Sequence, residues 1–255
     1  PDLMNLFREQ ATKFGAKTHM LNVEKVDISK KPFEVYVGSD IYKTHSIIIS
    51  TGASAKLLGL ENESKLMGYG VSACATCDAF FYKDKKVLVV GGGDSAMEEA
   101  LYLTKFASSV TIIHRRDSFR ASQIMQDRVL NNSKINIMWN HSVVDMLGDV
   151  DNGGLSSVLL KDIKLDKNVE VKCDGIFLAI GHTPNSSLFK DMVKFDKNDY
   201  IATIPGTTQT SVEGVFASGD IQDSKYRQAI TAAGSGCMAA IDCEHYLVSN
   251  ELIEI

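Results

Sequence analysis

The sequence predicts an α/β protein in which one layered domain is inserted into another. Three observations predict this class. A strand, a glycine-rich turn, a helix and a second strand follow one another over residues 85–114, which is the order of a βαβ unit. Two strand ends that contain glycine, at 50–54 and 179–185, bracket this region and are interpreted as crossings between the domains. A last strand at 214–220 leads into a long helix from about Ala229 to Val248.

The N-terminal part is expected to contain one helix and three strands. Residues 3–15 carry apolar side chains at roughly helical spacing, and Gly15 stands where a helix C-cap would stand. Three extended runs follow at 18–28, 32–38 and 42–51. The middle run is short and has turn residues on both sides, so the three runs predict a meander of antiparallel strands.

The central part alternates strands and helices from Lys85 onward. Longer elements are expected as strands at 85–90, 108–114 and 135–140 and as helices at 94–107 and 120–132. Short strands are expected at 144–149, 155–163, 169–173 and 175–182.

Composition bounds the function classes. The chain of 255 residues is 44% hydrophobic and 23% charged, which is ordinary for a globular protein with a buried core. Its net charge of −5 and the lack of an extended basic run argue against nucleic-acid binding. No apolar run approaches the ~20 residues that a membrane helix needs. Five scattered cysteines favour a reducing compartment over a secreted disulfide scaffold.

The turn after the strand at 85–90 has the pattern of a dinucleotide site. Gly91, Gly93 and Ala96 form G-x-G-x-x-A directly before a helix. The first glycine permits the tight turn, the second lets the backbone approach a pyrophosphate, and the small third residue packs helix against strand. Asp94 and Ser95 begin the helix and are included as cofactor-binding candidates. The alternative is a plain glycine turn.

The end of the next strand indicates which nucleotide binds. NAD sites place Asp or Glu there, whereas this chain has four basic residues, His114, Arg115, Arg116 and Arg120. Guanidinium groups suit a 2′-phosphate in both charge and geometry. The sequence therefore predicts NADPH, with a solvated basic patch as the alternative.

The C-x-x-C pair of Cys74 and Cys77 has three interpretations. It is half of a zinc site, a thiol–disulfide redox pair, or two unrelated buried thiols. Zinc needs two more ligands, and no second C-x-x-C or suitable histidine pair exists, so no metal is expected. Cys237 and Cys243, on the last helix, are interpreted as small core residues.

A redox pair beside a nicotinamide nucleotide has a further implication. Asp78, directly after the second cysteine, is a candidate proton donor and acceptor, or else a turn aspartate. A nicotinamide donates a hydride, which a disulfide does not accept efficiently by itself. An intermediary is expected, and a flavin is the usual one.

Four segments together resemble a known family, the low-molecular-weight thioredoxin reductases. They are GVSACATCDAF, VVGGGDSAMEEA, HRRDSFRAS and GVFASGDIQDSKYRQAITAAGSGCMAA, in the family's order. The resemblance implies two three-layer, Rossmann-like nucleotide-binding domains, the NADPH domain inserted into the FAD domain. The implied bounds are 56–182 for the NADPH and disulfide domain and 1–55 with 183–255 for the FAD domain.

The resemblance also implies roles for site residues. Cys77 is implied to be the thiol nearest the flavin, Cys74 the thiol that attacks the thioredoxin disulfide, and Asp78 the acid/base. Flavin contacts are implied for Asp220, Arg227, Gln228 and Ala229. Gly219, beside Asp220, and Gly181, at the second crossing, are included as cofactor-binding candidates. The helix that follows Gln228 is implied to point at the N1–O2 edge of the flavin, where its N-terminus stabilises negative charge.

The resemblance further implies a homodimeric cytoplasmic enzyme that rotates its two domains between half-reactions. The hinge is expected near 53–56 and 182–185. The family begins with a strand and a G-x-G-x-x-G loop for FAD, and these 255 residues start after it. We therefore expect an N-terminally truncated FAD domain, from a fragment or a shortened gene product with impaired FAD binding.

Two alternative functions remain open. The flavoprotein subunit of alkyl hydroperoxide reductase shares this core and carries additional N-terminal domains. A non-catalytic module that binds NADPH without turnover is the other alternative.

Overall fold

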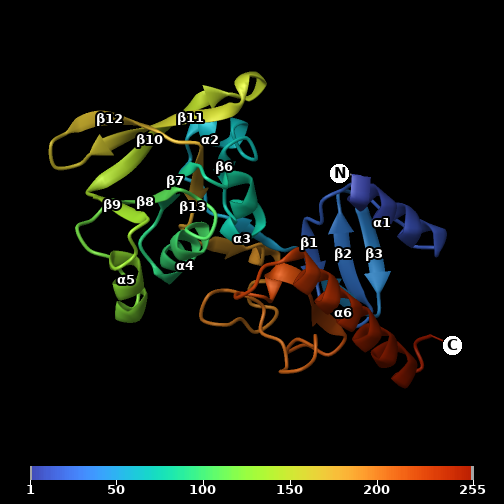
Figure 1. Ribbon diagram of the computed structural model, residues 1–255. Coiled ribbons are helices and arrows are strands. Elements are labelled where there is room, and N and C mark those ends of the chain that lie inside the picture. Colours follow the sequence, from blue (N-terminus) through green and yellow to red (C-terminus); the bar gives the residue numbers. More distant parts are fainter. Residues whose placement is uncertain (1, 254–255) are drawn as a thin grey trace. The chain divides into compact units, whose positions relative to one another are not determined.

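The computed structural model describes residues 2–253, and the chain divides into two compact units (Figure 1). One unit comprises residues 1–53 and 184–255, and the other comprises 54–183. The divisions fall within two residues of the domain bounds expected from the sequence. The chain passes between the units at β5 (Ala53–Ala55) and β14 (His182–Pro184), which pair with each other.

The unit of residues 1–53 and 184–255 begins with α1 (Asp2–Lys13) and a three-stranded sheet. The strands β1 (Lys25–Asp27), β2 (Phe33–Val37) and β3 (Asp40–Thr44) form the expected antiparallel meander. The third run, at 42–51, is not one strand. Thr44 donates its hydroxyl hydrogen to the Ser46 carbonyl, and this turn ends β3. The chain then forms β4 (Ile47–Ile49), which pairs in parallel with β15 (Val215–Ala217).

The same unit ends in a long helix, α6 (Ala229–Ser249), after the short 3₁₀ helices η3 (Ser187–Phe189) and η4 (Gly219–Ile221). Its core gathers side chains from the meander, β4, β15 and the connecting segments, including Phe33, Ile49, Ile201 and Val215. The interpretation of both helix cysteines as core residues is wrong for Cys237, which is exposed. Cys243 is half-buried with its sulfur 3.0 Å from Ser46 Oγ.

The unit of residues 54–183 is built on a five-stranded parallel sheet. Its strand order is β6-β13-β7-β8-β9. These strands span β6 Val71–Ser72, β7 Lys86–Val90, β8 Ser109–His114, β9 Ile135–Trp139 and β13 Gly175–Leu178. The helices are α2 Glu61–Lys65, α3 Ala75–Asp78, η1 Ala79–Tyr82, α4 Asp94–Leu103 and α5 Gln123–Leu130. An antiparallel sheet contains β10 His141–Asp149, β11 Gly154–Asp162 and β12 Lys167–Lys172, with η2 Val150–Asn152 in its first turn.

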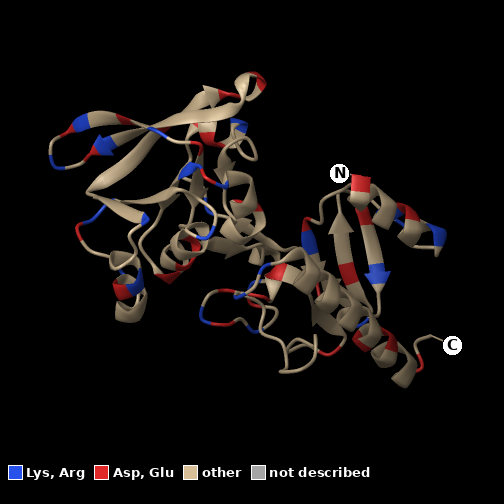
Figure 2. Cartoon of the chain, in the orientation of Figure 1, with Lys and Arg blue, Asp and Glu red and all other residues tan. Residues whose placement is uncertain are grey.

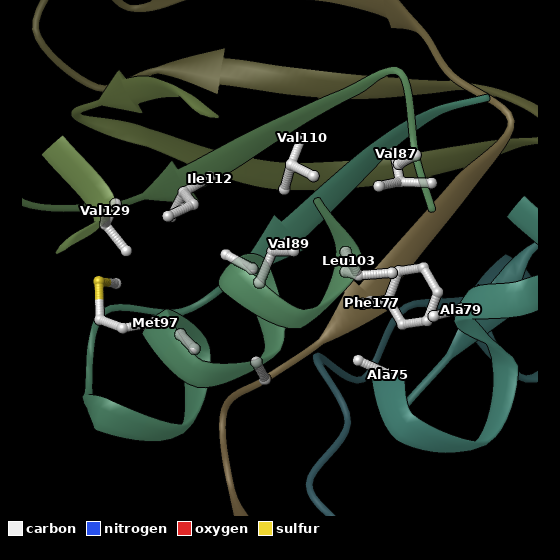
Figure 3. Close-up of a cluster of buried hydrophobic side chains, with 14 of the residues drawn as sticks. Ala75, Ala79, Val87, Val89, Met97, Leu103, Val110, Ile112, Val129 and Phe177 are labelled. Atoms are coloured by element: carbon white, nitrogen blue, oxygen red, sulfur yellow. The ribbon is translucent and has the colours of Figure 1, made fainter. Parts of the chain in front are cut away.

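Alternate residues of β7 face different layers. Val87 and Val89 lie in a core cluster with α3 and α4 (Figure 3). Leu88 and Val90 lie in a second cluster with side chains of β10 and β11. The parallel sheet is therefore the middle of three layers, with helices on one face and the antiparallel sheet on the other. The hydrophobic run VLVV is continuous because both faces of a central parallel strand are buried.

Charged side chains of both signs are intermixed in both units (Figure 2). In the β11–β12 turn, for example, Lys161 Nζ lies 2.6 Å from Asp166 Oδ1. Within residues 2–253, no helix has the length and apolar character to cross a membrane.

Candidate functional site

The C-x-x-C segment is a closed disulfide at the start of a short helix. Cys74 and Cys77 are bonded, with their Cα atoms 5.3 Å apart. Cys74 is the N-cap residue of α3, and the backbone N–H groups of Cys77 and Asp78 both donate to its carbonyl. Ala75 and Ala79 are buried in the core beside Phe177 and Leu103, which fixes the helix to the sheet (Figure 3). The disulfide is thereby held at the surface, with Cys77 exposed and Cys74 half-buried.

Asp78 is tied to this segment by a residue that the sequence did not single out. The Ser72 hydroxyl donates to Asp78 Oδ2 at 2.7 Å, and Ser72 Oγ accepts the backbone N–H of Cys74 at 3.0 Å. Ser72 is only 4% exposed, and Asp78 is half-buried. The arrangement places a carboxylate in a fixed position beside the redox pair, where it can exchange protons with a thiol.

The glycine turn between β7 and α4 packs as tightly as its motif requires. A Cβ at Gly91 would lie 2.5 Å from the Ala179 carbonyl oxygen and 2.6 Å from the Ala96 Cβ. Ala96 itself is fully buried. Gly93 is the N-cap residue of α4, and a Cβ there would meet nothing within 4 Å. The turn therefore presents bare backbone, at a helix N-terminus, to open space.

This open space is a cavity of about 580 Å³. It lies at the carboxyl ends of β7, β8 and β13, which is where nucleotides bind in open parallel sheets. Its lining includes Leu58, Gly91, Gly92, Gly93, Asp94, Ser95, His114, Arg115, Arg120, His141, Ser142, Val143, Ile180 and Gly181.

The basic residues after β8 do not all reach the cavity. Arg115 and Arg120 line it, whereas Arg116, among the residues described, is not part of the lining. The Arg116 carbonyl accepts the Asn140 N–H, and this bond links the β8 and β9 ends. The backbone N–H of Arg120 donates to the Gly92 carbonyl at 2.7 Å, which ties its segment to the glycine turn.

His114 is a buried wall of the cavity. Its ring contacts Phe119 and Trp139, and its Nε2 lies 3.0 Å from the Ser118 carbonyl oxygen. A Cβ at Gly92 would lie 2.2 Å from the ring, so Gly92 is needed beside this histidine. Burial lowers the pKa of His114, and nearby arginine charges lower it further, against the opposing effect of the backbone contacts. The imidazole is therefore neutral at neutral pH and does not add a positive charge.

Asp94 organises the site through its own contacts. Its Oδ1 accepts the backbone N–H of Ser122 at 2.9 Å and the Ser122 hydroxyl at 2.7 Å, and these bonds lower the pKa of Asp94. Ser122 is the N-cap residue of α5, so Asp94 joins the start of α4 to the start of α5. Ser95 lies in the first turn of α4 and lines the cavity directly.

Two further walls of the cavity were not expected from the sequence. One wall contains His141, Ser142 and Val143 of β10. β10 pairs with β11, and no local sequence motif predicts this pairing. Leu58 comes from a turn held by the buried carboxylate of Glu63. Glu63 is fully buried and accepts the backbone N–H groups of residues 58–60, at 2.7, 2.8 and 3.3 Å.

Gly181 also lines this cavity. It has a φ of +99°, a region that favours glycine, and its carbonyl accepts the Lys56 N–H at 2.9 Å.

A second cavity of about 520 Å³ lies in the unit of residues 1–53 and 184–255. It is lined by Ser50, Gly52, Ser218, Gly219, Asp220, Ala229, Ala232 and Gly236. These are the ends of β4 and β15 together with the first two turns of α6. The lining contains only small residues and one aspartate, and Cβ atoms at Gly52 and Gly236 would meet nothing within 4 Å.

The turn before α6 is held by Asp223. Partial burial raises the pKa of Asp223, but bonds from the N–H groups of Tyr226, Lys225 and Arg227 outweigh it, so the pKa lies below its usual value. Arg227 has a φ of +49°, and its guanidinium donates to the Ser224 carbonyl. Gln228 is the N-cap residue of α6. Of the three turn residues predicted to contact the flavin, only Ala229 lines the cavity as described.

The residues present fit the two nucleotides that the sequence implies. Around the first cavity, Gly93 leaves room for a pyrophosphate at a helix N-terminus, and Arg115 and Arg120, which follow β8, are part of the lining. Around the second, a helix N-terminus and a glycine-rich floor stand beside Asp220. Within residues 2–253, no cluster of three or more His, Cys, Asp or Glu could hold a metal ion.

The buried free cysteine, Cys173, takes no part in the site. Burial, and then the charge of Asp174, raises the pKa of Cys173 to about 12. Its thiol is therefore unreactive at neutral pH.

Comparisons with known proteins agree with this geometry. A family model described as pyridine nucleotide-disulphide oxidoreductase matches residues 2–236. A thioredoxin reductase of Rickettsia conorii is 52% identical over 97% of this chain and 80% of its own length. The solved thioredoxin reductase of Giardia duodenalis, 40% identical, superimposes with a TM-score of 0.90 over 97% of this chain and 81% of its own. That of Streptococcus pyogenes, 36% identical, gives 0.92 over 98% and 80%.

Proposed function

Because the chain belongs to the pyridine nucleotide-disulphide oxidoreductase family, and within it to the thioredoxin reductases, we propose that its substrate is the disulfide of a thioredoxin. The cofactors of this family are NADPH and FAD. When bound, they supply a hydride and relay its two electrons to the disulfide. One observation carries the proposal: the cavity with the glycine turn and the bonded Cys74–Cys77 pair belong to the same unit.

The nucleotide end of the reaction is assigned to the first cavity. Gly91 and Gly93 shape the turn, and Ser95 and the α4 N-terminus face the phosphates. Arg115 and Arg120 bind the 2′-phosphate, since both line the cavity beyond β8. This assignment leaves Arg116 outside the contact set.

The flavin end is assigned to the second cavity. Gly219 and Asp220 bind the sugar chain, and Ala229 lies where the N-terminus of α6 meets the ligand. The α6 dipole there favours negative charge. Arg227 and Gln228 act by shaping the turn that sets the direction of this helix.

The disulfide end is assigned to the exposed pair. When the pair is reduced, Cys74 attacks a sulfur of the thioredoxin disulfide, and Cys77 then closes the ring and releases reduced thioredoxin. Asp78 carries the proton that each thiol loses or gains. Since the pair lies in one unit and the flavin cavity in the other, we propose that the units rotate about 53–56 and 182–185. A homodimer in the cytoplasm is proposed on the same resemblance.

The test uses the purified chain loaded with FAD and a separately purified oxidised thioredoxin. We expect thioredoxin-dependent consumption of NADPH, followed by loss of nicotinamide absorbance, and none with Cys74→Ser or Cys77→Ser. A chain that holds FAD, is reduced by NADPH and still leaves thioredoxin oxidised would overturn the proposal. The same result would favour the alternative in which the chain reduces an attached partner domain, as in the flavoprotein subunit of alkyl hydroperoxide reductase.

A further inference from the structure

We propose that Ser72 is a positioning residue for thiol–disulfide exchange, which holds the Asp78 carboxylate and the Cys74 backbone in one arrangement. The inference rests on the proposed function, since it takes Asp78 as the group that exchanges protons with the pair. It concerns Ser72 alone, a residue outside the C-x-x-C-D motif. Its hydrogen bonds to Asp78 and to the Cys74 backbone orient the motif.

The position of Ser72 is set by the sheet. Ser72 is the last residue of β6, and it stands opposite Phe177 of β13 in the parallel ladder. Phe177 is fully buried among the side chains that also hold Ala75 and Ala79 of α3. The Ser72 backbone therefore belongs to the rigid core, while its side chain reaches the first turn of the disulfide helix.

The direction of the hydroxyl hydrogen follows from the donors around it. The backbone N–H of Cys74 donates to the Ser72 oxygen at 3.0 Å. The hydroxyl hydrogen is then left for an acceptor, and Asp78 Oδ2 at 2.7 Å is much closer than the Cys74 carbonyl at 3.5 Å. One serine thus connects the first cysteine of the pair to the carboxylate that follows the second.

Burial makes this arrangement specific. A hydroxyl at 4% exposure is unfavourable unless it is hydrogen-bonded, and here both its donor and its acceptor capacity are used. The bond holds one carboxylate oxygen, Oδ2, in a defined place next to the disulfide helix.

The step that this arrangement serves balances without any further reactant. An external dithiol gives a thiolate that attacks one sulfur of the Cys74–Cys77 bond, and that bond breaks as a mixed disulfide forms. The released sulfur takes a proton, and the second external thiolate then attacks the mixed disulfide and closes an external ring. Two electrons and two protons have moved to the pair, with Asp78 as the local proton carrier.

The test measures this exchange directly, in the full chain, with dithiothreitol as the only reductant. Reaction samples are quenched by acid, free thiols are alkylated, and the Cys74–Cys77 peptide is quantified by mass spectrometry from roughly pH 5 to pH 9. For Ser72→Ala we expect about tenfold slower reduction at neutral pH and a pH profile of changed shape, because the Asp78 carboxylate is no longer held beside the pair. Ser72→Thr, which keeps the hydroxyl, should restore the profile.

The matched control is Ser157→Ala. Ser157 is another buried serine, 3% exposed, and its hydroxyl donates to a carboxylate, Glu170, at 2.7 Å on the antiparallel sheet. Its loss should change the unfolding midpoint but not the pH profile. A Ser72→Ala profile that superimposes on that of the unchanged chain would overturn the inference.

A second measurement covers the case in which Ser72→Ala does not fold. If Ser72 acts through Asp78, then Ser72→Cys, which keeps the size of the side chain but loses the hydroxyl, should alter the profile in the chain with Asp78 and have no effect in an Asp78→Asn background. Additive effects in the two backgrounds would refute a positioning role. The assay requires neither nucleotide, flavin nor thioredoxin, so a chain that shows the Ser72 effect but does not reduce thioredoxin would overturn the proposed function alone.

Discussion

Two glycines of the same turn, Gly91 and Gly93, should respond to substitution in opposite ways. At Gly91 an added carbon would lie 2.5 Å from a backbone oxygen and 2.6 Å from a buried methyl group. Both distances are shorter than real contacts, and neither atom belongs to a flexible side chain. At Gly93 an added carbon would enter open space that belongs to the cavity.

The expected magnitudes follow from these surroundings. Overpacking a core usually costs about 1 to 3 kcal/mol, and two rigid contacts place Gly91→Ala at the upper end, about 3 kcal/mol. For a unit of this size that lowers the unfolding midpoint by roughly 10 °C. Gly93 has a φ of −102°, which any residue adopts, and it is a helix N-cap residue, so Gly93→Ser should stabilise α4 by a few tenths of a kcal/mol.

The effect on nucleotide binding should be the reverse. The Gly93→Ser side chain would stand where the pyrophosphate approaches, and losing one charge-assisted hydrogen bond weakens binding by about tenfold to a hundredfold. The chain has one tryptophan, Trp139, packed against Phe119 and the cavity residue His114. Its fluorescence therefore reports both the unfolding of this unit and, by quenching, the binding of NADPH.

The comparison is decisive because each variant is the control for the other. If Gly93→Ser binds NADPH as tightly as the unchanged chain, the phosphates do not lie against this turn. If Gly91→Ala unfolds at the same temperature as the unchanged chain, the packing between the turn, Ala96 and Ala179 does not limit the stability of the unit.

Three further predictions concern the same unit. Arg115→Ala and Arg120→Ala should each weaken NADPH binding by about tenfold or more in a titration and leave NADH binding unchanged, with Arg116→Ala as the silent control. Burial lowers the pKa of His114, so the unfolded chain binds its proton near pH 6.5 and the folded chain only at lower pH; the thermal unfolding midpoint, followed by Trp139 fluorescence, should therefore fall as the pH is lowered from neutral through about 6.5, and His114→Asn should flatten that slope. Glu63→Ala should leave the N–H groups of residues 58–60 without their acceptor, lower the unfolding midpoint by an amount equivalent to about 3 kcal/mol, and weaken NADPH binding. Unchanged NADPH binding would mean that this turn does not shape the cavity.

The sequence predicted those features that depend on neighbours along the chain. The glycine turn, the helix after it and the redox pair are local patterns, and each lies where its spacing indicates. The parallel arrangement of β7 and β8 follows from a short βαβ connection, which has few geometric solutions.

The rest depends on contacts between distant segments. The run at 42–51 was predicted as one strand, but its second half, β4, pairs with β15 in a different sheet. β15 lies more than 160 residues further along the chain, and nothing local in the sequence identifies it as the partner of β4. Arg115 and Arg116 are chemically equivalent in the sequence, and only the direction in which the chain leaves β8 separates them. Ser72 precedes the motif it serves, and its role appears only when β6 is paired with β13.

The alternation of neighbours along β7 has a consequence for how this protein tolerates change. Val89 packs among helices, whereas Leu88, the adjacent residue, packs against the antiparallel sheet. The parallel sheet therefore separates two hydrophobic core clusters, which are connected mainly through the backbone of its strands. Two substitutions in different clusters should therefore have additive effects on the free energy of unfolding, whereas two substitutions within one cluster should not. Evolution or design can therefore repack the side chains on one face of the sheet without changing those on the other face.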